Sequence, residues 1–77
     1  MPIFMVEENI IESIPGEFIS QALRAMPNAA TSPYEERNAV IMVPGIGRVR
    51  VICKKMTHKR AKLTHVFWMA VRVVRIQ

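Results

Sequence analysis

The chain has 77 residues and a formal net charge of +5 at pH 7, with 11 basic side chains against six acidic ones. A chain of this length forms one domain, here residues 1–77, and buries only about 60% of the surface that it exposes when unfolded, so its margin of stability is small. Cys53 is the only cysteine. An intramolecular disulfide is therefore excluded, and a reducing compartment is favoured.

The composition also argues against secretion and against a membrane span. Glu7 and Glu8 interrupt the first apolar residues, and no basic segment precedes them, so the pattern of a signal peptide is missing. Uncharged runs such as residues 38–47 and 63–71 are far shorter than the roughly 20 residues that cross a bilayer. We therefore expect a cytoplasmic protein that has no contact with a membrane.

Residues 13–26 have the spacing of one amphipathic helix. Ser13 is the predicted N-cap, a proline is tolerated in the first turn, and Pro27 ends the helix. The apolar side chains that recur at helical spacing are Ile14, Phe18, Ile19, Ala22, Leu23 and Met26. Before this helix, residues 7–12 fit either a helical turn or an edge strand, and residues 2–6 have the character of an added N-terminal strand.

Residues 38–77 are rich in β-branched and aromatic side chains and have turn residues where hairpins need them. Pro44 and Gly45 suit a type II turn after the first strand, because proline sets the first corner and glycine accepts the positive φ of the second. We expect Val43 to pair with Arg48. In that register the core face carries Val40, Met42, Val49 and Val51, and the other face carries Ile41, Val43, Arg48 and Arg50.

The third strand, residues 63–76, breaks the alternation because both of its faces are apolar. One face has Val66, Trp68 and Ala70, and the other has Phe67, Met69, Val71 and Val73. A slip at residues 73–74 predicts a β-bulge. One helix cannot cover both faces, and large apolar side chains are costly to leave in water. We therefore expect the N-terminal segment or a second chain to cover Phe67, Met69 and Val71, and we predict a homodimer or higher homo-oligomer through this protein interface.

The predicted fold class is α+β. One amphipathic helix packs on a three-stranded antiparallel β-meander, and an N-terminal strand is an optional addition to the sheet. Charge divides this domain into an acidic helical part, residues 1–37, and a basic β part, residues 38–77. All six acids lie in the first part, and the second has nine lysines or arginines and no acid.

The basic part is the strongest functional signal in the sequence. Rows of cations with hydrogen-bond donors between them suit a phosphate backbone. The candidate nucleic-acid-binding residues are Arg48, Arg50, Lys54, Lys55, Lys59, Arg60 and Lys62, of which the last three are expected in a loop over residues 57–62. Two other interpretations remain open. The lysines could protect a solvated strand edge, or the surface could bind an acidic protein partner.

The sequence has no signature of catalysis or of a bound metal. Cys53, His58 and His65 lack the spacing of a structural zinc site, which needs four ligands. No acid lies near a Cys–His pair to orient the imidazole, and the first hairpin turn lacks the following helix of a phosphate loop. We therefore expect no enzyme activity and no cofactor. Phe67 and Trp68 are neighbours that face opposite sides of a strand, so core packing is expected for both.

These observations favour a small non-enzymatic module that grips nucleic-acid phosphates through a basic β-ribbon and loop. They do not distinguish DNA from RNA or indicate a sequence preference. The alternative is a small accessory or inhibitor protein of plasmid or phage type that acts by binding a protein partner. The first function predicts salt-dependent binding to nucleic acid, and the second predicts one stoichiometric partner.

Overall fold

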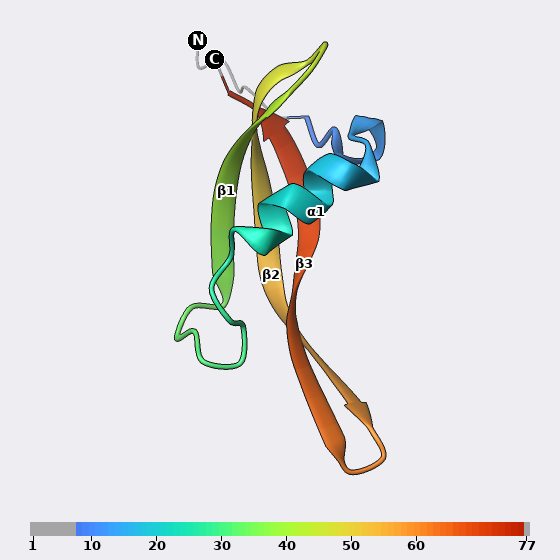
Figure 1. Cartoon of the computed structure of the whole chain (residues 1–77), viewed down its shortest axis with the longest axis vertical. Helices are drawn as coiled ribbons and strands as arrows, with labels where there is room; N and C mark the ends of the chain where they lie inside the picture. Colours follow the sequence, from blue (N-terminus) through green and yellow to red (C-terminus); the bar gives the residue numbers. More distant parts are fainter. Residues whose placement is uncertain (1–7, 77) are drawn as a thin grey trace, which may run out of the picture.

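The computed structural model describes residues 8–76, which form one α-helix and a three-stranded antiparallel sheet of order β1-β2-β3 (Figure 1). The elements in chain order are a short 3-10 helix η1 (Ile11–Ser13), α1 (Gly16–Arg24), β1 (Glu36–Val43), β2 (Gly47–Arg60) and β3 (Leu63–Arg75). The predicted α+β fold with a β-meander is therefore confirmed. The predicted strand over residues 2–6 lies outside the described residues.

The helix α1 begins later than the sequence predicts, at Gly16. Ile14 has φ −98° and ψ 122°, an extended conformation, because the ring of a following proline disfavours helical geometry. Pro15 takes the N-cap position without a side-chain cap hydrogen bond. The prediction of Ser13 as N-cap is therefore wrong, and Ser13 instead ends η1. Within residues 8–76, no helix has the length and apolar character needed to cross a membrane.

The β1–β2 hairpin has a register one residue away from the predicted one, because Val43 pairs with Gly47. The connection consists of residues 44–46 only. Within it, the amide of Ile46 donates to the carbonyl oxygen of Val43 at 3.1 Å, and Gly45 has φ +85°. These two features are those of the predicted type II turn. The predicted turn type is confirmed, but β2 begins at Gly47, one residue earlier than expected.

This one-residue difference exchanges the two faces of β1, since side chains alternate along a strand. Ile41 and Val43 are buried under the helix, whereas Val40 and Met42 are exposed on the opposite face. The predicted core face is therefore wrong for β1. It is right for β2, whose buried side chains are Val49, Val51 and Cys53.

β2 and β3 extend far past β1 as a twisted two-stranded hairpin (Figure 1). Beyond the pair of Lys55 with Trp68, the two strands pair only with each other, as far as the turn at residues 61–62. The predicted loop over residues 57–62 is therefore wrong, because strand pairing continues almost to the tip. We call this extension, residues 56–67, the ribbon.

The bulge in β3 lies inside the sheet and not at residues 73–74. The register shifts between Ile52 and Cys53, and Val71 is the residue of β3 that has no opposite partner. This extra residue places Val73 on the helix-covered face, where it is fully buried. The predicted position of Val73 on the other face is therefore wrong.

The core lies between α1 and the face of the sheet that the helix crosses (Figure 1). Ala22 is fully buried at this contact, and Phe18 and Leu23 pack beside it. The indole Nε1 of Trp68 donates to the carbonyl oxygen of Pro27 at 2.7 Å. This hydrogen bond satisfies the buried indole and ties the chain after α1 to β3.

Candidate nucleic-acid interface

The ribbon is the most exposed part of the chain that the structure describes. All of its side chains are exposed except that of Val66, which is half-buried. Its tip is a turn in which Ala61 has φ +55°. Lys59, Arg60 and Lys62 surround this turn, and no acidic residue follows Glu36 anywhere in the chain. The molecule measures 51 × 32 × 19 Å, and the ribbon forms one end of its longest axis (Figure 1). This end of the molecule is therefore cationic.

The seven predicted cations do not share one face of the sheet. We call the face opposite α1 the open face. Alternation along β2 places four of them on the open face: Arg48, Arg50, Lys54 and Arg60. These four are exposed and extend over about 40 Å of strand. Lys55 and Lys59 lie on the other face, and Lys62 lies in the turn.

Lys55 is the least available of the seven cations. Its Nζ donates a hydrogen bond to the carbonyl oxygen of Ser32 and lies 5.9 Å from the centroid of the Trp68 ring. The second contact is of the cation–π type. Lys55 therefore holds the loop before β1 against β3, and a phosphate would have to compete with these contacts.

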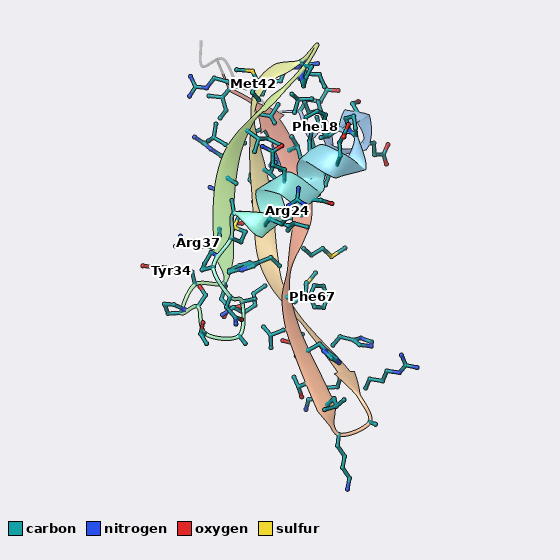
Figure 2. All side chains as sticks on the ribbon, viewed as in Figure 1. Phe18, Arg24, Tyr34, Arg37, Met42 and Phe67 are labelled. Atoms are coloured by element: carbon teal, nitrogen blue, oxygen red, sulfur yellow. The ribbon has the colours of Figure 1, made fainter. Side chains whose placement is uncertain are left out.

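The predicted protein interface is partly exposed within this chain. Phe67 and Met69 lie on the open face and are 44% and 48% exposed, and Val71 is half-buried at the bulge. Figure 2 shows Phe67 where the ribbon leaves the sheet. The expected core packing is confirmed for Trp68 and wrong for Phe67. The homodimer through these residues stays a prediction.

Sequence reasoning missed a wider apolar surface around Phe67 and Met69. Apart from Tyr34, every exposed large hydrophobic side chain in residues 8–76 belongs to the open face: Val40, Met42, Met56, Leu63, Phe67 and Met69. Val40 and Met42 were missed because the predicted register placed them in the core. The sequence did contain a signal for the observed register, which is Gly47. A glycine accepts the φ of +106° found there, so β2 can begin at this residue after a turn of three residues and not four.

The cysteine and the two histidines of the chain do not come together. His58 lies opposite His65 in the ribbon, whereas Cys53 is fully buried on the helix-covered face. Within the part of the chain that the structure describes, no group of three or more His, Cys, Asp or Glu side chains could hold a metal ion. The chemistry that remains at the exposed end is therefore that of cations, imidazoles and apolar side chains.

Cys53 should react with a thiol reagent only after the protein unfolds. Its side chain is fully buried, and burial raises the pKa of the Cys53 thiol. Both effects reduce the thiolate that a disulfide reagent needs. At about pH 8, we expect labelling of the native protein to be slow and limited by opening, and labelling in denaturant to be immediate. Equal labelling rates in the two conditions would contradict the burial of this thiol.

No family model matches the chain, and no curated protein or solved structure matches it either. Its function is therefore inferred from the charge, exposure and geometry of its own residues.

Proposed function

We propose that the protein is a non-enzymatic nucleic-acid-binding module that grips phosphates with the ribbon and the cations of β2. The observation that carries this proposal is the row of exposed cations at Arg48, Arg50, Lys54 and Arg60 in a stretch of chain that has no acid. Cations placed along a phosphate backbone release its condensed counterions, which is the main source of affinity for nucleic acid.

The shape of the ribbon supports the same function. A two-stranded antiparallel ribbon is one of the elements that nucleic-acid-binding proteins present to their ligands. Here it projects clear of α1 and β1, so a polyanion can approach it from either face (Figure 1). Continuous pairing from the sheet to the turn holds its side chains at fixed spacing.

The position of the acids favours approach by the ribbon end. Glu12 lies in η1 and Glu17 in the first turn of α1. Figure 1 places these elements near the β1–β2 turn, at the opposite end of the long axis from the ribbon. Arg48 and Arg50 follow the same turn, so that end carries charges of both signs, whereas the ribbon carries cations and no acid and attracts a polyanion.

The test is a salt titration of binding to duplex DNA, single-stranded DNA and RNA of mixed sequence. With four to six phosphate contacts, the log of the affinity for duplex should fall with the log of the salt concentration at a slope of about −4 to −5. Single strands should give a somewhat smaller slope for the same number of contacts. Undetectable binding to all three ligands at about 50 mM salt would reject the proposal, because electrostatic binding is strongest at low salt.

A second candidate is an accessory or inhibitor protein that binds a protein partner. The exposed apolar side chains of the open face favour it, since such patches mark interaction sites. This function predicts one stoichiometric partner with an acidic surface and weak nucleic-acid binding that is indifferent to the form of the ligand. The same titration therefore separates the two candidates.

A further inference from the structure

The open face carries one combination of side chains at four places, and between them it also has the half-buried Ile52 and Arg72 and the buried Val74. In the antiparallel register, Met42 lies beside Arg48, Val40 beside Arg50, and Met69 beside Lys54. At the tip of the ribbon, Leu63 lies beside Arg60. In each of these pairs, the Cβ atoms of a cationic residue and an apolar residue lie about 5 Å apart on the same face of the sheet.

The apolar side chains of this face converge where the ribbon joins the sheet. Phe67 lies opposite Met56, and Met69 is the next side chain along the same face of β3. Phe67 is the one exposed phenyl ring that the register places on the open face, and the exposed imidazoles of His58 and His65 lie farther along the ribbon on the same face. The ring therefore has apolar neighbours on two sides and cations on the strand beside it.

Charge decides which kind of partner suits this surface. The strands place one carboxylate on the open face, that of Glu36 at its corner, opposite Lys54. A second copy docked face to face would bring two rows of cations together, and like charges in an interface cost several kcal/mol. An anionic partner with apolar surfaces of its own complements both the cations and the side chains between them.

Resting on the proposed function, we propose that the ligand of the open face is single-stranded nucleic acid, which lies along β2 with its phosphates at Arg48, Arg50 and Lys54. Its bases pack on Phe67 and on the methionines around that ring. Arg48 and Arg50 lie about 6.8 Å apart on this face of β2, and Lys54 lies about 14 Å beyond Arg50 because Ile52 stands between them. An extended single strand can follow these spacings. Base stacking on an exposed aromatic ring is a main source of affinity in single-strand binding.

A duplex does not fit the same surface as well. Its bases are stacked on each other, so a broad face meets only the sugar-phosphate exterior, and the apolar side chains gain no partner. The sheet and ribbon also twist along their length (Figure 1). A flexible single strand can follow this twist, whereas a stiff duplex contacts it at fewer points.

The test compares three ligands of about 12 nucleotides at about 50 mM salt, within the usual site size for single-strand binding. They are a mixed-sequence single strand, the same strand annealed to its complement, and an abasic single strand with the same charge as the first. Phe67→Ala is the test variant. Tyr34→Ala is its control, because Tyr34 is an exposed aromatic residue that lies outside the open face. Circular dichroism checks the fold of each variant.

We expect the single strand to bind at least about tenfold more tightly than the duplex or the abasic strand. Phe67→Ala should weaken single-strand binding at least about fivefold, as expected for the loss of one stacked base. Duplex binding should stay within about twofold, and Tyr34→Ala should have no effect. Equal affinity for duplex and single strand would overturn the inference, as would equal weakening of both by Phe67→Ala.

Failure of the inference and failure of the proposed function give different results. Salt-dependent binding that prefers duplex and ignores Phe67→Ala keeps the function and rejects the single-strand site. Absence of binding to all three ligands rejects both. Sedimentation of the free protein measures its oligomeric state as a third readout. A dimer that Phe67→Ala dissociates would assign the open face to a second copy of this chain.

Discussion

Replacing Trp68 with alanine should leave most of the protein unfolded at 25 °C. The indole is 9% exposed, it packs in the core, and its Nε1 donates to the carbonyl oxygen of Pro27 at 2.7 Å. Truncation of a buried tryptophan costs about 3–5 kcal/mol, which is comparable to the roughly 3–5 kcal/mol that one small core supplies. The loss also frees Lys55 and the loop that it holds. Far-ultraviolet circular dichroism and urea unfolding measure the effect.

Met42→Ala is the matched control for this prediction. Met42 is another large apolar residue of the sheet, but it lies on the open face and is 60% exposed. Surface truncations of this kind usually change the free energy of unfolding by less than about 0.5 kcal/mol. A Trp68→Ala protein that lost less than about 1 kcal/mol, or no more than Met42→Ala, would show that the indole is not a core anchor.

The elements of this fold could be predicted because each has a local cause. The helical spacing of Phe18, Ala22 and Leu23 and the turn chemistry of Pro44 and Gly45 need no information from distant parts of the chain. One local detail, the start of the helix, was predicted wrongly. The helix start moved because Ile14 precedes a proline, a local rule that outweighs a suitable cap residue.

The position of the site depends on strand register, which is where sequence reasoning failed. A turn of three residues and one of four fit the same Pro–Gly pair, yet they send opposite sets of β1 side chains to the core. The cations of β2 were assigned to the site from charge alone. Their division between two faces, and the apolar partners Val40 and Met42 beside them, became visible only once pairing was known.

The predicted loop over residues 57–62 failed for a related reason. Its polar and basic composition is typical of loops, but Thr57 and His58 still alternate across a hairpin and pair with Val66 and His65. Polar strands outside a core carry no hydrophobic alternation to reveal them. The error matters for function, because a paired ribbon holds its cations at fixed positions, as a mobile loop would not.

Removing the three cations of the ribbon tip should strongly weaken binding to duplex DNA. In the triple variant Lys59→Ala, Arg60→Ala and Lys62→Ala, the slope of log affinity against log salt should flatten by about two to three units on duplex DNA, since each lost contact releases about one counterion fewer. The three side chains are exposed at the end of the molecule that is farthest from α1 (Figure 1). Stability should therefore change little.

A second triple variant separates a local site from net charge. Arg24→Ala, Arg37→Ala and Arg75→Ala together remove the same charge from α1, from the start of β1 and from the end of β3, away from the ribbon. If the ribbon tip holds phosphates, the first variant should lose far more affinity and slope than the second at equal net charge. Equal losses would mean that binding follows overall charge and needs no defined site. An unchanged slope in the tip variant would exclude the tip and leave Arg48, Arg50 and Lys54 of the open face as the phosphate contacts.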